Sequence, residues 1–337
     1  MRAFELTGPR VGQVVEVPAP APAPDQAVVE VHRVGLCGTD VEFFTGEMAY
    51  LHDGNAAYPL RLGHEWCGVV ADVGAGIDPA WLGRRVTGDT MLGCQRCRRC
   101  RNGRQHVCDD RYEIGIRGGW PGALAERLVV PGFALRALPD TVDAVAGAMV
   151  EPGGNALRAV QAAALTEGER LLIWGPGTIG LLAAQFARAQ GVEVHLVGHD
   201  AASLAFAREL GFEHSWTNDA LPDLPYDAMI DATYGVEVPR TALDRVEPGR
   251  RVVYIGLSGE PSTIDTRTLV LKDVTAVGIL SASPGLAGAI ERYGSGAVDP
   301  TPLVAGTVGL ARTADVLAGW RPDLAGPGPK VHVDPRR

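Results

Sequence analysis

The sequence predicts two domains, an all-β unit followed by an alternating α/β unit that is built on a parallel sheet. The chain has 337 residues, which is too long for one ordinary hydrophobic core. Short strand candidates separated by glycine and proline fill the first 150 residues, and apolar strands then alternate with helices. Hydrophobic residues make up 46% and charged residues 21%, a globular composition that excludes a disordered or fibrous chain.

The first part is expected to be a barrel-like unit of short strands. Glycines and prolines interrupt the apolar runs at short intervals, as they do between the strands of barrels. The run of prolines and alanines at 18–24 should be an extended connection, because proline fixes φ and lacks a backbone donor. The expected strands cover 14–17, 27–34, 68–73, 85–89 and 125–130.

The second part is expected to form a parallel sheet with helices on both faces. Its strands are almost continuously apolar, which is typical of strands buried on both sides. The expected strands are 170–174, 193–197, 228–231, 252–257 and 274–280, with helices at 178–189 and 202–210. Beyond residue 290 the chain is rich in glycine and proline, and we expect one helix there, at 313–319.

A glycine motif after the strand 170–174 indicates a dinucleotide site. Gly175, Gly177 and Gly180 are spaced as G-x-G-x-x-G, with Thr178 and Ile179 opening the following helix. The first glycine makes the turn, the second admits the pyrophosphate, and the third lets helix and strand pack closely. The helix amino terminus then faces the phosphate charge.

The end of the next strand bears on the choice of cofactor. NAD enzymes place a carboxylate there on the ribose 2′-hydroxyl, but this chain has Gly198. His199 could donate a hydrogen bond to a 2′-phosphate, whereas Asp200 could restore an NAD contact. We expect a small preference for NADP over NAD, which Gly198→Asp should reverse.

Four cysteines within fifteen residues predict a structural zinc site. They occur as C-x₂-C-x₂-C-x₇-C at Cys94, Cys97, Cys100 and Cys108. The chain shows no export signal, so a disulfide is a poor explanation. Four thiolates complete tetrahedral zinc and leave no position open. The arginines between these cysteines could suggest nucleic-acid binding. No aromatic residue is interleaved among them to stack on bases, so we favour a solvated basic lobe.

Metal-ligand residue types also occur in three separate segments, at 35–40, 63–65 and 150–152. These segments contain Cys37, His64 with Glu65, and Glu151. Together with the cysteine lobe and the glycine motif, they resemble the zinc-dependent medium-chain dehydrogenase/reductase family over essentially the whole chain. A carboxylate at 151 is more similar to the branch of sorbitol, threonine and glucose dehydrogenases.

That resemblance implies a fold and a ligand set. The fold is a GroES-like catalytic domain (1–152, returning at 290–337) interrupted by a Rossmann domain (153–289), with the active site between them. Cys37 and His64 are implied as ligands of a catalytic zinc, with Glu65 or Glu151 at the remaining protein position. The lobe at 94–108 matches the structural zinc of the family.

Chemistry agrees with the implied activity. Zinc with thiolate, imidazole and carboxylate ligands keeps one position open, and it lowers the pKa of an alcohol whose hydride passes to nicotinamide. Thr39 could pass the alcohol proton outward, and Asp40 would orient His64. Many relatives have histidine three residues after position 39, whereas this chain has Glu42. The proton relay through the cofactor ribose is therefore expected to end on a carboxylate or to bypass that position.

The expected partners are a small hydroxylated substrate and further copies of the chain. Polar residues in 45–59, with Glu113 and Trp120, would suit a polyol, sugar or cyclitol, and we expect a homodimer or homotetramer. The net charge of −9 opposes nucleic-acid and membrane roles, and the apolar stretch 171–187 is broken by Gly175, Pro176 and Gly177, so we expect a cytoplasmic protein. Only two lysines occur, Lys272 and Lys330, which we attribute to codon bias.

Two other functions remain open at this stage. One is a zinc-free quinone or enoyl reductase of the same superfamily, which would need neither Cys37 and His64 nor the cysteine lobe. The other is a zinc-ribbon protein that binds nucleic acid, suggested only by the arginines of the lobe. Zinc content separates these functions. Two zinc ions per chain are expected for the zinc-dependent dehydrogenase, none for the quinone or enoyl reductase, and one for the zinc-ribbon protein.

Overall fold

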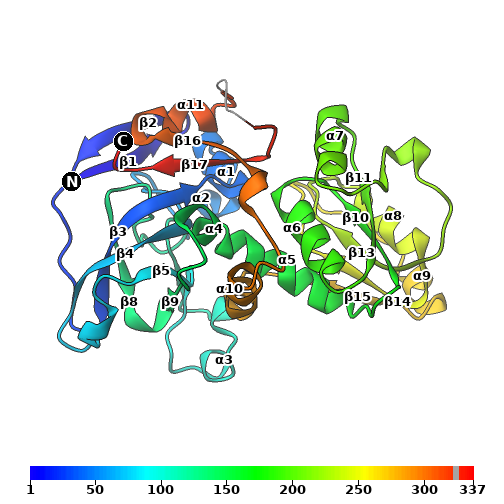
Figure 1. Cartoon of the computed structure of the whole chain (residues 1–337), viewed down its shortest axis with the longest axis horizontal. Helices are drawn as coiled ribbons and strands as arrows, with labels where there is room; N and C mark the ends of the chain where they lie inside the picture. The colour runs from blue at the N-terminus through cyan, green and yellow to red at the C-terminus, as the bar shows by residue number, and fades with distance from the viewer. Residues whose placement is uncertain (322–325) are drawn as a thin grey trace. The chain divides into compact units, whose positions relative to one another are not determined.

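The computed structural model describes residues 1–321 and 326–337, and it divides into two compact units (Figure 1). Unit 1 consists of Met1–Glu151 together with Leu286–Arg337, and unit 2 consists of Pro152–Gly285. Unit 2 is therefore inserted in the sequence of unit 1, whose two parts must meet through long-range contacts.

Unit 1 is built on a mostly antiparallel sheet in the order β16-β17-β3-β4-β5-β9, with β8 also paired to β3. Two smaller sheets pair β1 with β2 and β6 with β7. The strands are β1 (Arg2–Gly8), β2 (Val11–Glu16), β3 (Gln26–Gly35), β4 (Glu65–Val73), β5 (Arg85–Gly88), β6 (Met91–Leu92), β7 (Tyr112–Glu113), β8 (Arg127–Pro131), β9 (Leu135–Ala137), β16 (Val304–Gly309) and β17 (Lys330–Asp334).

The helices of unit 1 are short, and its core lies against the sheet. Phe4, Phe43, Leu62 and Trp66 are fully buried in one cluster with apolar residues of β3, β8 and β17. The helices are α1 (Gly38–Thr45), α2 (Ala49–His52), α3 (Arg98–Arg101), α4 (Ala144–Ala148), α10 (Leu286–Gly294) and α11 (Thr313–Leu317), and α5 (Val150–Ala163) begins in this unit.

Unit 2 is a parallel sheet in the order β12-β11-β10-β13-β14-β15 with helices between its strands (Figure 1). Leu171, Leu172 and Ile173 in its middle are fully buried, as expected for an apolar strand covered on both faces. The elements are β10 (Arg170–Trp174), α6 (Thr178–Arg188), β11 (Glu193–Val197), α7 (Ala201–Glu209), β12 (Ser215–Trp216), β13 (Tyr226–Asp231), α8 (Val238–Arg245), β14 (Val246–Tyr254), α9 (Thr266–Leu271) and β15 (Thr275–Gly278).

This architecture confirms the predicted combination of an all-β unit with a doubly wound parallel sheet. Within the described residues, no helix has the length and apolar character needed to span a membrane. The helix expected at 313–319 is present as α11, whereas β16 and β17, which join the main sheet, were not expected from the sequence. Every residue of β17 is buried although Lys330, His332 and Asp334 alternate along it, so its burial does not follow hydrophobicity.

Candidate catalytic, metal and cofactor sites

Strand pairing in unit 1 brings Cys37, His64 and Glu65 together. Cys37 follows β3 and precedes α1, while Glu65 opens β4 and lies opposite Gly35 in the register of the two strands. One ligand atom from each of the three residues lies within 4.8 Å of the others. Gly35 is required there, because a Cβ at that position would lie 2.1 Å from Oε2 of Glu65.

Asp40 lies beside this cluster and contacts two of its members, Cys37 and His64. Its carboxylate is fully buried, with Oδ2 accepting a hydrogen bond from the backbone N of Cys37 at 2.9 Å. Oδ1 lies 3.6 Å from Nδ1 of His64. Burial lowers the pKa of His64, but Asp40 and Cys37 raise it more, and the net pKa lies well above 6.5. Asp40 thus has the position expected of a group that orients the imidazole.

Glu65 is paired with a cation that the sequence analysis did not consider. Nζ of Lys330 in β17 donates to both carboxylate oxygens of Glu65, at 2.8 and 2.7 Å, and to the backbone O of Leu36 at 2.9 Å. The two side chains are 4% and 2% exposed. Burial lowers the pKa of Lys330, but Glu65 raises it more, so the ammonium remains charged. The interpretation of the low lysine count as codon bias did not anticipate this buried pair.

The other candidate residues lie on α1 and in the first turn of α5. Glu151 is buried in the first turn of α5 and is outside the set that meets within 4.8 Å. Thr39 and Glu42 lie on α1, the helix that begins after Cys37. Burial, followed by repulsion from Glu47, raises the pKa of Glu42.

The four cysteines of the lobe also converge. Cys94, Cys97, Cys100 and Cys108 offer sulfur atoms that all lie within 4.8 Å of one another. Sγ of Cys97 and Sγ of Cys108 are 3.7 Å apart. A tetrahedron with Zn–S bonds of about 2.3 Å has sulfur–sulfur edges of about 3.8 Å. Backbone hydrogen bonds from Arg96 and Cys97 lower the pKa of Cys94 to about 6, whereas burial and the neighbouring thiols raise the pKa of Cys100 to about 12, so the fit rests on the distances between the sulfur atoms. The donor set therefore fits zinc.

The glycine motif of unit 2 has the backbone that a dinucleotide turn needs. Gly175 has φ +93°, in the left-handed region, and a Cβ there would lie 2.7 Å from the backbone O of Ala232. At Gly180 a Cβ would lie 1.9 Å from the backbone O of Gly175, so only glycine lets helix and turn approach this closely. Gly177 is exposed and precedes Thr178 and Ile179 at the amino terminus of α6.

The three positions expected to discriminate NADP from NAD differ in their hydrogen bonds, exposure and packing. Asp200 caps α7, with Oδ2 accepting a hydrogen bond from the backbone N of Ser203 at 2.8 Å. His199 is exposed. A Cβ at Gly198 would lie 2.8 Å from Cγ of Pro176, in a ring that cannot swing aside. Gly198→Asp therefore perturbs packing as well as charge, and it is a poorer test than the sequence suggested.

A third set of ligand-type side chains in unit 2 does not form a metal site. Glu193, His195 and His214 have ligand atoms within 4.8 Å of one another. The two imidazole rings are stacked, with centroids 4.5 Å apart and planes 9° apart, so their in-plane lone pairs run parallel and do not converge.

Hydrogen bonds also engage two members of this third set, Glu193 and His195. Trp216 Nε1 can only donate, and it lies 3.2 Å from Nδ1 of His195, so Nε2 of that ring carries the proton. Nε2 donates to Oε1 of Glu193 at 2.8 Å, and Arg170 binds both oxygens of the same carboxylate. Glu193 and His195 are thus both engaged in hydrogen bonds.

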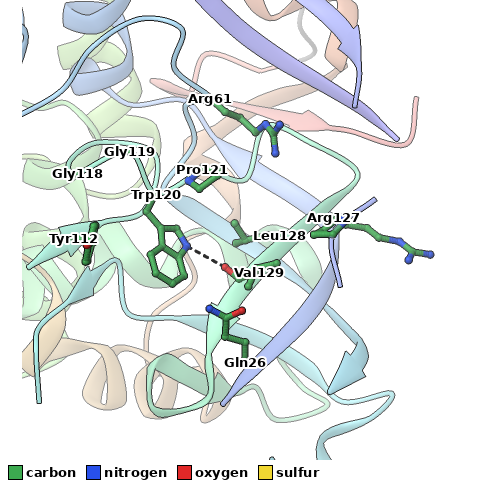
Figure 2. A pocket seen from close by; sticks show the side chains of 11 residues that line it. Gln26, Arg61, Tyr112, Gly118, Gly119, Trp120, Pro121, Arg127, Leu128 and Val129 are labelled. Atoms are coloured by element: carbon green, nitrogen blue, oxygen red, sulfur yellow. Dashed lines mark hydrogen bonds between the residues drawn. The ribbon is translucent and has the colours of Figure 1, made fainter. Parts of the chain in front are cut away.

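Part of the polar stretch expected near the substrate forms a bonded cluster within unit 1. Tyr50 donates its hydroxyl to Oε1 of Glu113 at 3.3 Å, and Nε of Arg111 donates to the same oxygen at 2.7 Å. Nη2 of Arg111 also donates to the Tyr50 hydroxyl at 3.2 Å. Trp120 instead packs beside β8, where its Nε1 donates to the backbone O of Val129 (Figure 2).

Comparison with known proteins identifies the family of the chain. Residues 23–140 match the alcohol dehydrogenase GroES-like domain, and residues 178–293 match the zinc-binding dehydrogenase family. An L-threonine 3-dehydrogenase of Saccharopolyspora erythraea is 32% identical over 83% of this chain and 83% of its own. One from Rhizobium rhizogenes is 27% identical over 99% of this chain and 98% of its own.

A solved structure extends the likeness to three dimensions. A putative zinc-binding dehydrogenase from Sinorhizobium meliloti, bound to NADP, is 28% identical and covers 99% of both chains with a TM-score of 0.89. The fold and these matches define a nicotinamide-dependent alcohol oxidoreductase that uses zinc. The chain belongs to the zinc-dependent medium-chain dehydrogenase/reductase family. Membership excludes the zinc-ribbon nucleic-acid protein considered above.

Proposed function

We propose that this protein transfers hydride between NAD(P) and the carbinol carbon of a polyol, sugar, cyclitol or amino alcohol, at a zinc held by Cys37 and His64. The convergence of the Cys37 thiol and the His64 imidazole in unit 1 carries the proposal. Relatives named L-threonine 3-dehydrogenase support a hydroxylated substrate. The same convergence disfavours a zinc-free quinone or enoyl reductase, which would need no such ligands.

Glu151 is proposed as the third protein ligand, in preference to Glu65. Both oxygens of Glu65 accept from the Lys330 ammonium, and a zinc ion on this carboxylate would face that cation directly. Glu151 is a buried carboxylate of the same unit. Glu151→Gln should then remove the catalytic zinc, and Glu65→Gln should retain it. Zinc loss in Glu65→Gln alone would reverse the assignment.

Residues on α1 and at the start of β4 are proposed to orient the site and move a proton. Bound zinc supplies Lewis acidity that lowers the pKa of the alcohol, and the nicotinamide exchanges the hydride. Asp40 fixes the imidazole of His64 from behind. The Thr39 hydroxyl carries the alcohol proton away, and Glu42 on the same helix is the proposed acceptor further along.

The cysteine lobe is proposed to hold a second, structural zinc. Four sulfur donors complete its tetrahedron and leave no position for a substrate. The arginines of the lobe are then a solvated surface. Arg99 pairs with Asp109 and Arg96 with Asp110, both just after the lobe, which supports this view over an anion-binding role.

NADP is proposed as the preferred cofactor. Asp200 is engaged as the cap of α7, and releasing it toward a ribose hydroxyl would remove a hydrogen bond that stabilises this helix. Gly198 supplies no carboxylate, and exposed His199 can donate to a 2′-phosphate. These features support NADP without excluding turnover with NAD.

A second copy of the chain is the proposed protein partner. β15 ends the parallel sheet, with Thr275, Ala276 and Gly278 exposed, so its outer backbone groups can pair with another strand. Leu271 is 85% exposed just before it. Leu271→Asp should shift the molecular mass measured by light scattering toward the monomer. Val11→Asp, on an exposed strand of unit 1, is the matched control.

The central experiment combines a substrate screen with zinc analysis. Polyols, sugars, cyclitols and amino alcohols are assayed by nicotinamide absorbance with both cofactors, on wild type and on Cys37→Ala. We expect Cys37→Ala to lose turnover and one of two zinc ions. Cys67→Ala removes a buried thiol outside the ligand set and should keep both. Full activity with unchanged zinc in Cys37→Ala would contradict the proposal.

A further inference from the structure

The turn at 198–200, where the adenosine ribose of the cofactor is expected, is tied by backbone hydrogen bonds on both sides. Toward the glycine motif, backbone N of Gly175 donates to O of Val197 at 2.9 Å. Toward the edge of the sheet, backbone N of Gly198 donates to O of Trp216 at 3.0 Å. The position of this turn relative to the glycine motif therefore depends on the strand that carries Trp216.

Trp216 belongs to β12, which is the shortest strand of the parallel sheet and one of its two edges. Two residue pairs join it to β11, Ser215 with Leu196 and Trp216 with Val197. Arg208 adds a hydrogen bond to the backbone O of Ser215. An edge strand with so few backbone pairs opens easily. Side-chain contacts must therefore help to hold the carbonyl of Trp216 in place.

A network of hydrogen bonds fixes the indole of Trp216, and its members are Arg170, Glu193, His195 and Trp216. Nε1 of Trp216 donates to Nδ1 of His195 at 3.2 Å, and Nε2 of His195 donates to Oε1 of Glu193 at 2.8 Å. Nε and Nη2 of Arg170 donate to the two oxygens of that carboxylate, at 2.7 and 3.2 Å. The network thus crosses three neighbouring strands, β10, β11 and β12.

Burial strengthens this network and keeps His195 neutral. His195 is 1% exposed, so its hydrogen bonds are shielded from competition with water. Burial lowers the pKa of His195 more than Glu193 raises it, and His214 and Arg170 lower it further. Hydrogen bonds from Arg170 and His195 lower the pKa of Glu193 to about 2, so this carboxylate stays ionised. A neutral imidazole keeps the lone pair on Nδ1 that accepts from Trp216.

We propose that His195 and Trp216 are positioning residues for cofactor binding. Their hydrogen bond holds β12 against β11, and the carbonyl of Trp216 then holds the 198–200 turn where the adenosine ribose binds. Both side chains act through the backbone of Gly198 and need not touch the cofactor. The inference rests on the proposed place of the adenosine ribose at this turn, and it does not depend on the catalytic zinc.

Calorimetric titration of the full-length protein with 2′,5′-ADP and AMP tests the proposal. These compounds are the adenosine halves of NADP and NAD, so their binding requires neither nicotinamide nor turnover. Trp216→Phe keeps a ring but removes the donor, and His195→Leu removes the acceptor. Each should weaken the fragment that wild type binds more tightly about three- to five-fold, because the positioned turn loses the stabilisation of one hydrogen bond. A protein that binds fragments normally but turns over no alcohol would contradict the proposed function alone.

A conservative variant and a matched control separate the hydrogen bond from ring packing. His195→Asn places an amide oxygen near the position of Nδ1, so it should recover much of the affinity lost in His195→Leu. His214 stacks on His195 with ring centroids 4.5 Å apart, whereas the hydrogen bonds of the network run through other side chains. His214→Leu should therefore bind both fragments like wild type. Melting temperatures check that all variants are folded.

Four results would overturn the inference. One is unchanged fragment affinity in both Trp216→Phe and His195→Leu, because the network would then contribute to stability alone. Another is an equal loss of affinity in His195→Asn and His195→Leu. A third is a loss in His214→Leu as large as that in Trp216→Phe, which would assign the effect to ring stacking. The last is that wild type binds neither fragment, which would place the adenosine ribose away from this turn.

Discussion

The buried pair of Lys330 and Glu65 allows a quantitative test of how the candidate metal centre is held together. Lys330→Met removes the cation and leaves a buried carboxylate that is 2% exposed on its side chain. Removing one partner of such a pair costs about 3–5 kcal/mol, because the remaining charge is left uncompensated. For a unit of this size that corresponds to a drop in Tm on the order of 10 °C.

The double variant isolates the charge effect from lost packing. Glu65→Gln in the Lys330→Met background removes the orphaned carboxylate, and most of the lost stability should return. The assay is calorimetric melting of wild type, both single variants and the double variant, in zinc-loaded and zinc-free protein. In zinc-loaded protein the cost of Lys330→Met should be smaller, since a nearby dication stabilises the freed carboxylate.

A matched control uses an exposed ion pair. Arg240 and Asp244 face each other at 3.8 Å on the surface of α8, with side chains 64% and 53% exposed. Arg240→Met should lower Tm by only about 1 °C, because exposed pairs contribute little. If Lys330→Met behaved like this control, or if the double variant were as unstable as the single one, the charge-pairing argument would be refuted.

Three further predictions concern other parts of the chain. Cys100→Ser should lose one zinc ion and lower Tm while leaving the other zinc bound, and metal analysis showing two ions at unchanged Tm would contradict a structural site. Burial, with Lys330 and Arg33 adding to it, lowers the pKa of His332 from 6.5 to about 3. As pH falls below 6.5, His332 therefore becomes protonated in the unfolded chain before it does in the folded one. The free energy of unfolding decreases between pH 6.5 and 3, by about 2 kcal/mol at pH 5. His332→Leu should flatten this acid loss of Tm relative to wild type, and equal slopes in both proteins would reject the assignment. Wild type should show a higher kcat/KM with NADP than with NAD. His199→Ala should lower kcat/KM with NADP about five-fold and leave kcat/KM with NAD nearly unchanged. A wild-type preference for NAD would instead make Asp200 the ribose partner.

Local patterns explain what could be predicted from the sequence. β10 and β11 match the expected ranges to the residue, since an apolar run bounded by turn residues specifies a buried strand by itself. The four cysteines were found through their spacing within one short loop, where chain connectivity already keeps them close. The requirement for glycine at Gly175 and Gly180 likewise arises from one strand–turn–helix unit.

Contacts between distant segments explain what was missed. Ionisable residues alternate with valines in β17, which begins with Lys330. An ionisable residue in a strand that is buried needs a partner, and this signal could have identified Lys330 as half of a buried pair. Its partner could not be identified, because Glu65 precedes it by 265 residues and meets it only through sheet pairing.

The pairing of Glu65 with Lys330 also has a consequence for the order of events during synthesis. At roughly 5–20 residues per second, a ribosome needs on the order of half a minute to make the 265 residues that separate the two partners. Throughout that interval the nascent polypeptide carries Glu65 without its ammonium, and unit 2 emerges in full before β17 exists. The buried ion pair is therefore formed last, and a truncated chain that ends after unit 2 keeps the Glu65 carboxylate without its ammonium partner.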